Sequence, residues 1–195
     1  MAFREDPSHF WRFSRDFLGL IDTIRPTFTH RFLAALEVDG RLSCVVTQNI
    51  DMLHQAAGST RVLEVHGSYR TGRCLDTGKS YTFQRMRAMM EKDEIPRSES
   101  GGVIKPDIVF FGDEVMHVEE AAEAIGNCDL LFVLGSSLSV YPAGGLPQMA
   151  RGPVVIVNDG DVAMDADETR VFHVREDLDS YFRNVAQAYG WTIGV

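Results

Sequence analysis

Five short apolar runs in the sequence each end abruptly in polar or glycine residues, and this recurrence constrains the fold more than any other feature. The junctions are Val46 to Thr47-Gln48-Asn49, Val65 to His66-Gly67, Phe111 to Gly112-Asp113, Leu134 to Gly135-Ser136-Ser137 and Val157 to Asn158-Asp159. Strands that alternate with helical segments in this way are typical of a mostly parallel sheet. If the strands are parallel, all five clusters lie along one edge of the sheet, where open α/β sheets bind ligands.

The predicted fold class is therefore α/β, a Rossmann-like, mostly parallel sheet with helices on both faces. We expect helices at 7–24, 27–36, 84–94, 118–125, 144–150 and 177–189, and strands at 42–46, 62–65, 108–111, 130–134, 154–157 and 171–174. A short helix should follow Asp51, with Asn49 or Asp51 as its N-cap. Residues 69–104 are polar and show little strand alternation. We interpret them as a small subdomain inserted into a main domain of residues 1–68 and 105–195.

Composition and charge narrow the class of protein. The formal net charge is −9, from 28 acidic and 19 basic residues, which argues against a nucleic-acid partner. No apolar stretch reaches the roughly 20 residues of a membrane helix, and the N-terminus lacks a signal-peptide pattern. The three cysteines are far apart and odd in number, so a disulfide framework is not expected. These features predict a cytoplasmic protein without a membrane partner.

Three of the junctions carry side chains suited to binding a phosphate or to chemistry on a sugar. Gly135-Ser136-Ser137 follows a strand, and free backbone N–H groups and hydroxyls there suit a phosphate, particularly if a helical turn begins at this point. It is not a nucleophile elbow, because the final glycine of G-x-S-x-G is missing. His66 is expected near Asn49 and Asp51, and imidazole titrates near neutral pH as a general base should. This set fits sugar chemistry without identifying a cofactor.

Four motifs, taken in order and spacing, carry a family resemblance. They are TQNID with LHQAAGS and EVHGS across residues 47–68, KPDIVFFGD at 105–113, GSSLSVYPA at 135–143 and VIVN at 155–158. Together they resemble the central block of the sirtuins, the NAD-dependent protein deacylases, in wording closest to the bacterial type. The resemblance covers most of the chain from about Pro26 onward.

The resemblance implies NAD as cofactor, an acyl-lysine protein or peptide as substrate, and acyl transfer to ADP-ribose with release of nicotinamide. His66 would deprotonate a ribose hydroxyl, Asn49 would orient the ribose and a water, and Asp51 would bind the nicotinamide amide. Cofactor-binding residues would be Gln48, Ile50, Gly135, Ser136, Ser137, Asn158 and Arg175. The substrate peptide would be held as an added strand, with Phe111 lining the tunnel for the acyl-lysine stem. Substrate-binding residues would be Val109, Phe111, Gly112 and Val140.

The sequence also departs from the family pattern. The opening strand and Gly-Ala-Gly loop have no match, so we expect the sheet to lack a member and expose an edge. The zinc module has Cys74, but Thr77 stands at its partner position and serines replace the second cysteine pair within 96–101. One thiolate cannot build a tetrahedral site, so we predict no zinc and a mobile 69–103 unless packing replaces the metal.

Three single positions bear on the substrate. Asp113 stands where the family usually has Glu, so the carboxylate reaches less far from the backbone. Ser14 and Phe17 stand where members that remove acidic acyl groups carry Tyr and Arg, so a neutral acyl group, such as acetyl, is predicted.

Two other functions are compatible with these motifs. One is a non-catalytic binding module that keeps the groove for acyl-peptide or ADP-ribose. The other is a different NAD-consuming activity, glycohydrolysis or ADP-ribosyl transfer, in which water replaces the acyl oxygen. The dependence of nicotinamide release on an acyl-lysine discriminates among them. A hydride-transferring dehydrogenase is not expected, because the G-x-G-x-x-G fingerprint is missing.

Overall fold

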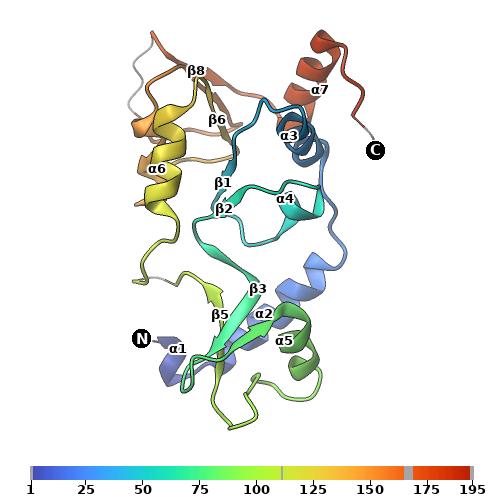
Figure 1. The fold of residues 1–195 in the computed structure, drawn as a ribbon, viewed down its shortest axis with the longest axis vertical. Coiled ribbons are helices and arrows are strands. Elements are labelled where there is room, and N and C mark those ends of the chain that lie inside the picture. Colours follow the sequence, from blue (N-terminus) through green and yellow to red (C-terminus); the bar gives the residue numbers. More distant parts are fainter. Residues whose placement is uncertain (1, 111, 165–168, 194–195) are drawn as a thin grey trace. The chain divides into compact units, whose positions relative to one another are not determined.

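The computed structural model describes residues 2–110, 112–164 and 169–193, and its contacts group the chain into two compact units (Figure 1). The first unit comprises Met1–Arg25, Asn49–Met52 and His66–Asp113. The second comprises Pro26–Gln48, Leu53–Val65 and Glu114–Val195. None of the helices in the described ranges combines the length and apolar character needed to span a lipid bilayer.

The second unit holds the parallel strands that the apolar runs predict. β1 (Val45–Thr47) pairs with β2 (Val62–Glu64), and both run in the same direction. A three-stranded parallel sheet has the order β6-β7-β8, with strands Leu131–Leu134, Val154–Val157 and Val171–Val174. These strands form where β-branched and aromatic residues cluster, since such side chains fit a pleated, buried surface.

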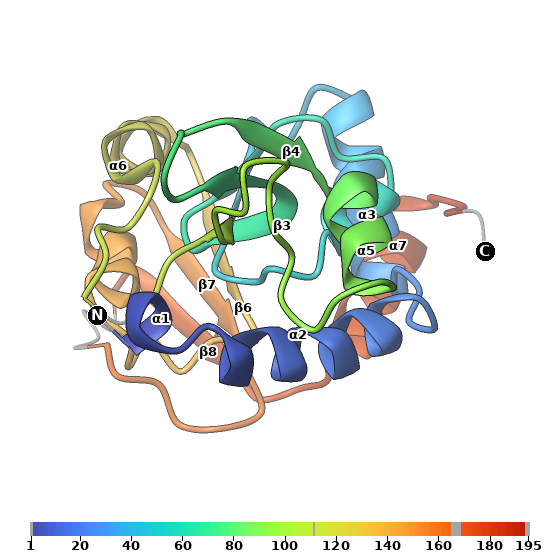
Figure 2. The same ribbon diagram turned by 90° about the horizontal axis from the view of Figure 1, so that it is seen from below.

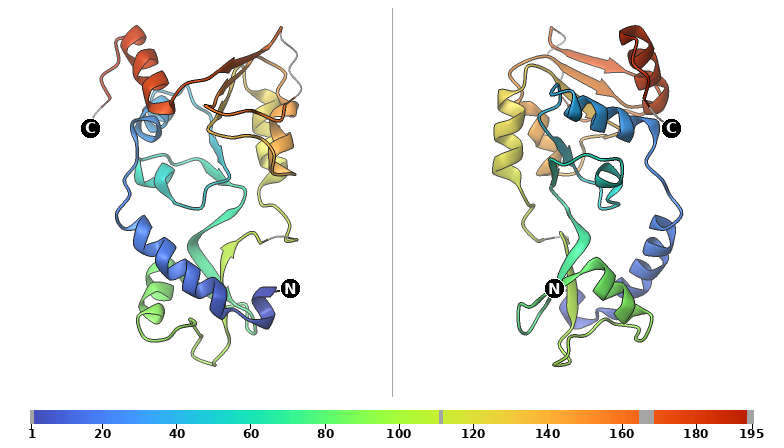
Figure 3. Two further views of the ribbon diagram at one scale, coloured as in Figure 1. Left: turned by 180° about the vertical axis from the view of Figure 1, so that it is seen from behind. Right: turned by 45° about the vertical axis from the view of Figure 1, so that its right-hand side comes forward.

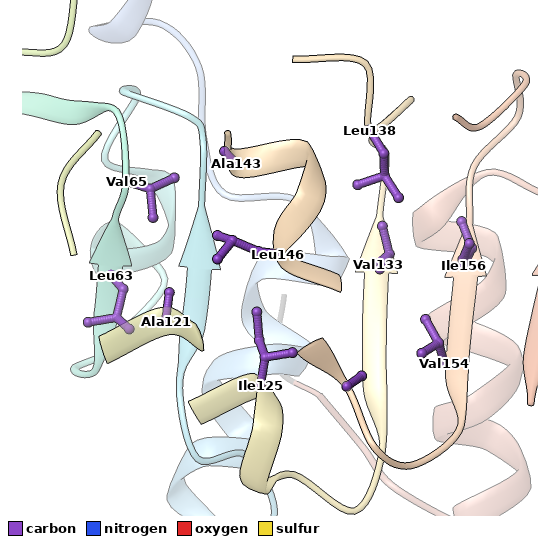
Figure 4. Packing of buried hydrophobic residues seen from close by; sticks show 11 residues of the cluster. Leu63, Val65, Ala121, Ile125, Val133, Leu138, Ala143, Leu146, Val154 and Ile156 are labelled. Atoms are coloured by element: carbon purple, nitrogen blue, oxygen red, sulfur yellow. The ribbon is translucent and has the colours of Figure 1, made fainter. Parts of the chain in front are cut away.

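Helices cover both faces of the β6-β7-β8 sheet. Successive side chains of β6 point to opposite faces, so they enter two different cores. Val133 packs with α6 (Val118–Asn127) and the 3₁₀ helix η1 (Ala143–Met149), in a core that also takes Val154 and Ile156 (Figure 4). Phe132 and Leu134 belong to a second core with α3 (Phe28–Val38) and α7 (Leu178–Tyr189), which lie side by side (Figure 3). This arrangement is the expected layer structure of an α/β sheet.

Asp179, in the first turn of α7, caps the neighbouring helix α3. Its carboxylate accepts hydrogen bonds from the Phe28 amide (3.0 Å), the Thr29 amide (2.8 Å) and the Thr29 hydroxyl (2.6 Å). Burial opposes ionisation of this carboxyl, but the bonds from Thr29 and Phe28 outweigh it and lower its pKa to about 2. A carboxylate at a helix N-terminus satisfies orphan N–H groups and complements the helix dipole.

Replacing Asp179 with alanine should lower the free energy of unfolding by roughly 1–3 kcal/mol, because charged hydrogen bonds to a helix end are lost. The folded pKa lies below the usual 3.8, so the unfolded state binds more protons between these values. The contribution should therefore be full above about pH 4 and disappear as the pH falls towards 2. Urea unfolding at several pH values, with the exposed Asp129→Ala as control, tests this. An equal loss at pH 7 and pH 2.5 would contradict it.

The first unit is built on an antiparallel sheet of order β4-β3-β5. Its strands are β3 (Gly67–Cys74), β4 (Ser80–Thr82) and β5 (Ile104–Ile108). Its helices are α1 (Ala2–Glu5), α2 (Ser8–Ile21) and α5 (Phe83–Met90), and α2 runs alongside α5 (Figure 2). The buried Trp11 donates its indole N–H to the Ile104 carbonyl at 3.2 Å, which ties α2 to the sheet.

Several predicted elements were wrong. The strand expected at 108–111 is β5, which ends at Ile108, and its buried alternate residues include Pro106. Residues 67–74 form a long strand that was not predicted, and it pairs with the nearby β4 as well as with the distant β5. The helix α4 (Leu53–Ala56) begins two residues after Asp51, and the helix expected at 144–150 is 3₁₀. Because β5 pairs antiparallel with β3, the one-edge argument does not extend to Gly112-Asp113.

Candidate functional site

Predicted cofactor residues of the second unit follow three consecutive strands of one parallel sheet. Gly135, Asn158 and Arg175 come directly after β6, β7 and β8. The Gly135 amide donates to the Val157 carbonyl at 2.9 Å, and the Asn158 amide donates to the Val174 carbonyl at 3.1 Å. The carboxyl ends of these strands therefore gather polar groups at one edge, and two of the five predicted junctions, those at Gly135 and Asn158, are among them.

The loop that follows β6 is shaped by its own hydrogen bonds. Gly135 takes the left-handed conformation at φ +58°, and the Ser136 hydroxyl accepts from the Leu138 amide at 3.2 Å. The hydroxyls of Ser137 and Ser139 are 2.8 Å apart, and Ser137 is exposed. No helical turn begins at Ser136, since the next helical element, η1, starts at Ala143. Any phosphate held here would contact a serine-rich loop and not a helix N-terminus, which corrects the sequence prediction.

Arg175 is oriented by a contact from the neighbouring loop. Its guanidinium donates to Asp161 Oδ1 at 2.7 Å, and both side chains are exposed. The Asn158 side-chain amide donates to the Gly160 carbonyl at 3.0 Å. These contacts leave cationic and amide groups at the edge where a nucleotide would need them.

The first unit contains the predicted catalytic residues. Asn49 is exposed, whereas Asp51 and His66 are half-buried, and Ile50 packs against that unit's core. Gln48 belongs to the second unit. The backbone of His66 is fixed, because its carbonyl accepts the Val109 amide at 2.9 Å.

Asp113 ties the end of the predicted substrate segment to Phe110 and to Lys105 of β5. Its carboxylate accepts from the Phe110 amide (3.2 Å) and the Lys105 ammonium (3.1 Å), and its own amide donates to the Phe110 carbonyl (2.9 Å). Burial opposes ionisation, but these two donors outweigh it, so the pKa of Asp113 lies below its ordinary value. From the sequence we predicted only that Asp113 has a shorter side chain than the usual Glu. Its contact with Lys105 was missed, because no local pattern indicates it.

The remaining substrate residues differ in their surroundings. The Val109 N–H is already bonded to the His66 carbonyl, so it is not open to an added strand. Gly112 is exposed, and Phe111 lies outside the described residues. Val140 belongs to the second unit and is half exposed, with its carbonyl accepting the Gly144 amide at 2.7 Å.

The positions considered for acyl preference face the core of the first unit. Ser14 is fully buried, and its hydroxyl lies 2.7 Å from the Tyr69 hydroxyl. The Phe17 ring centroid lies 5.6 Å from that of Tyr69. Burial raises the pKa of the Tyr69 hydroxyl, so this group is neutral at physiological pH. No cation therefore occupies either position.

The donor set near Cys74 does not fit a zinc ion. Cys74 faces Ser98, with Sγ to Oγ at 3.4 Å. Across the described ranges, no three His, Cys, Asp or Glu side chains converge as metal ligands would. Neutral hydroxyls around one thiol do not make the tetrahedral thiolate and imidazole set that structural zinc requires.

Comparison with known proteins identifies relatives of this chain. A family model described as Sir2 family matches residues 1–142. An NAD-dependent protein deacetylase of Sulfurisphaera tokodaii is 38% identical over 167 residues, which are 84% of this chain and 67% of the relative. NAD-dependent protein deacetylase 2 of Caldanaerobacter subterraneus is 37% identical over 182 residues, 92% of this chain and 72% of the relative. The chain thus spans about two thirds to three quarters of these proteins.

Solved structures are similar over nearly the whole chain. One of Sir2 with a p53 peptide and NAD+ gives a TM-score of 0.89 at 34% identity, covering 96% of this chain and 80% of that chain. One of Sir2 bound to an acetylated peptide also gives 0.89 at 34% identity, covering 97% and 82%. The similarity confirms the predicted α/β, Rossmann-like fold class. From its motifs, its fold and the family match over residues 1–142, the chain belongs to the Sir2 family.

Proposed function

We infer that this protein is an NAD-dependent protein-lysine deacetylase, which transfers the acyl group of an acyl-lysine to ADP-ribose and releases nicotinamide. The observation that carries this conclusion is the similarity, at 34% identity over 96% of the chain, to Sir2 with a p53 peptide and NAD+. The polar residues of TQNID and the histidine of EVHGS are all present. The substrate is an acyl-lysine protein or peptide.

Three residues of the first unit are proposed to act on the reacting groups. NAD, when bound, supplies the ADP-ribosyl group that receives the acyl group. His66 removes a proton from a ribose hydroxyl through an imidazole nitrogen. Asn49 orients the ribose and a water through its amide, and Asp51 accepts hydrogen bonds from the nicotinamide amide.

The cofactor-binding roles rest on the polar edge of the β6-β7-β8 sheet. The loop Gly135-Ser136-Ser137 offers hydroxyl and backbone donors for phosphates, and Asn158 holds a ribose. Arg175 supplies a positive charge beside them. The proposed set is completed by Gln48 and Ile50 in the TQNID motif.

The substrate peptide is proposed to contact Val109, Phe111, Gly112 and Val140. Replacing Asp113 with alanine removes the acceptor for the Phe110 amide and Lys105, which loosens this segment. Since Asp113 is partly exposed, the loss should be about 1 kcal/mol, so the KM for an acetyl-lysine peptide should rise about fivefold with a smaller change in kcat. Steady-state kinetics with the exposed Glu114→Ala as control test this. An unchanged KM would contradict it.

The proposal extends to the acyl group, the metal content, the location and the domain division. The buried pair Ser14 and Tyr69 offers no cation to a carboxylate, which supports acetyl or another neutral acyl group over succinyl. The donor set at Cys74 supports a protein without zinc. A cytoplasmic location is also part of the proposal. We retain the division into an NAD-binding domain of residues 1–68 and 105–195 and an inserted subdomain of residues 69–104.

The decisive experiment measures nicotinamide release from NAD by the purified chain, with acetyl-lysine, succinyl-lysine or unmodified lysine peptides. Release that requires the acetyl peptide and yields deacetylated peptide supports the proposal. Release without any peptide would indicate a glycohydrolase or ADP-ribosyltransferase. No release from a chain that is folded by circular dichroism would indicate a binding module. Faster turnover of the succinyl peptide would overturn the acyl preference alone.

A further inference from the structure

Two turns of the first unit meet at Cys74, which is 1% exposed. The first turn, residues 74–79, is closed by the Cys74 amide donating to the Lys79 carbonyl and the Gly78 amide donating to the Cys74 carbonyl, both at 2.9 Å. The second turn, residues 98–102, is closed by the Ser98 amide donating to the Gly102 carbonyl at 2.8 Å. Both turns are thus closed by backbone hydrogen bonds.

The Ser98 hydroxyl joins the two turns. It accepts the Cys74 thiol at 3.4 Å and the Gly102 amide at 3.0 Å, and it lies 3.0 Å from the Ser100 hydroxyl. The Ser98 and Thr77 hydroxyls can turn their O–H groups towards the sulfur once the thiolate forms, and these hydrogen bonds lower the pKa of the Cys74 thiol to about 7 against the effect of burial. Ser98 is buried at 8% exposure, so these bonds are shielded from water.

The backbone of the second turn packs directly on the thiol. A Cβ added at Gly102 would lie 2.6 Å from Cys74 Sγ and 2.5 Å from Asp76 Oδ2, closer than real contacts allow. The space next to the sulfur is therefore filled by the chain itself, which is the packing that a metal-free module needs.

Glu99 anchors the second turn from outside. Its carboxylate accepts the Tyr81 hydroxyl at 2.7 Å and the Lys79 ammonium at 3.1 Å, and it lies 3.6 Å from the Arg85 guanidinium. The Tyr81 bond is the main cause of a pKa of about 2 at Glu99. The carboxylate thus connects the second turn to β4 and α5, and it stays charged at physiological pH.

We propose that residues 74–102 form a metal-independent clip, in which the Ser98 hydroxyl and the Glu99 carboxylate hold together two turns that zinc joins in a cysteine-ligated module. The clip replaces one metal ion with a set of hydrogen bonds. These bonds are shielded from water only while the two turns are in contact. The clip does not depend on the proposed deacetylase activity. The module should consequently keep its structure in the presence of a chelator.

The reactivity of Cys74 provides a direct test, because a buried thiol reacts only when the clip opens. In a Cys44→Ser/Cys128→Ser background, Cys74 is the sole thiol, and its labelling by a chromogenic disulfide reagent reports opening. Ser98→Ala should accelerate labelling about tenfold to hundredfold, since a buried hub is lost. The matched control is Ser100→Ala, which removes one exposed hydroxyl and should change the rate by less than about threefold. Glu99→Gln should also accelerate labelling, compared with Glu94→Gln, which lies between the two turns and pairs with Arg12 of α2.

Metal content and thermal stability complete the experiment. The purified chain should contain far less than one zinc per molecule, and its Tm should be the same with a chelator or with added zinc. Stoichiometric zinc together with a Tm that falls on chelation would overturn the proposal. Equal labelling rates in Ser98→Ala and Ser100→Ala would also overturn it. If Ser98→Ala does not fold, the Glu99→Gln comparison decides the question in the same way.

Discussion

Replacing His66 with alanine is expected to reduce peptide-dependent nicotinamide release by at least a hundredfold. A positioned general base contributes about 10²–10⁴ to a rate, and no other histidine is proposed for this step. The fold should survive, because the bond from the Val109 amide goes to the backbone carbonyl of His66 and not to its ring. The defect should therefore lie mainly in kcat, with little change in Tm.

The control for this experiment is His9→Ala, which removes an exposed histidine of α2 and should retain full activity. Initial rates of nicotinamide release and peptide deacetylation are measured on the same samples, with thermal melting as the check on folding. A His66→Ala protein that keeps more than about a tenth of the wild-type rate would show that His66 is not the base. Equal losses in both variants would point to a structural effect of α2.

The parallel strands and the final helix could be predicted because their signals are local. β7 occupies the predicted residues, Val154–Val157, since a short run of β-branched side chains indicates a buried strand. α7 also matches the prediction closely. Asp177 caps it by accepting the Ser180 amide at 2.9 Å, and Gly190 ends it in the left-handed conformation at φ +69°.

The antiparallel sheet of the first unit could not be predicted from local signals. β5 contains Lys105-Pro106-Asp107, which reads as a turn, yet Pro106 is buried opposite Gly72 of β3. The β3–β5 pairing joins residues at least 30 positions apart, as in Cys74 with Ile104, so its stabilisation is tertiary. This error displaced the strand to 108–111 and with it the expected position of the substrate segment.

The candidate site was predicted unevenly for the same reason. The polar groups after β6, β7 and β8 follow from strand ends in the sequence. Asp113 contacts Lys105, which is 8 residues away in the sequence, and Asp179 contacts the N-terminus of α3, which is about 150 residues away. Both contacts form only when the chain folds. No local pattern distinguishes these carboxylates from ordinary surface acids.

Gly67 follows His66 directly, and replacing it with alanine is expected to destabilise the first unit severely. Its backbone has φ +69°, and a Cβ at this position would lie 1.9 Å from the Asp107 carbonyl oxygen and 2.9 Å from its carbon. Both obstacles are backbone atoms of β5, which cannot move without breaking the β3–β5 pairing at Gly67 and Ile108. The free energy of unfolding should fall by more than about 4 kcal/mol, a loss that single substitutions cause only when they produce a severe structural defect.

Gly78→Ala separates the two causes of this loss. Gly78 has nearly the same φ, +70°, but nothing lies within 4 Å of an added Cβ, so only the backbone strain remains. That strain should cost about 1–2 kcal/mol. Urea unfolding of both variants, with activity measured under native conditions, gives the difference due to the clash. If the two variants were equally stable, the clash between the added Cβ and β5 would contribute nothing to the loss, and the prediction would be wrong. If Gly67→Ala folds but loses activity, the glycine is required for the position of His66 itself.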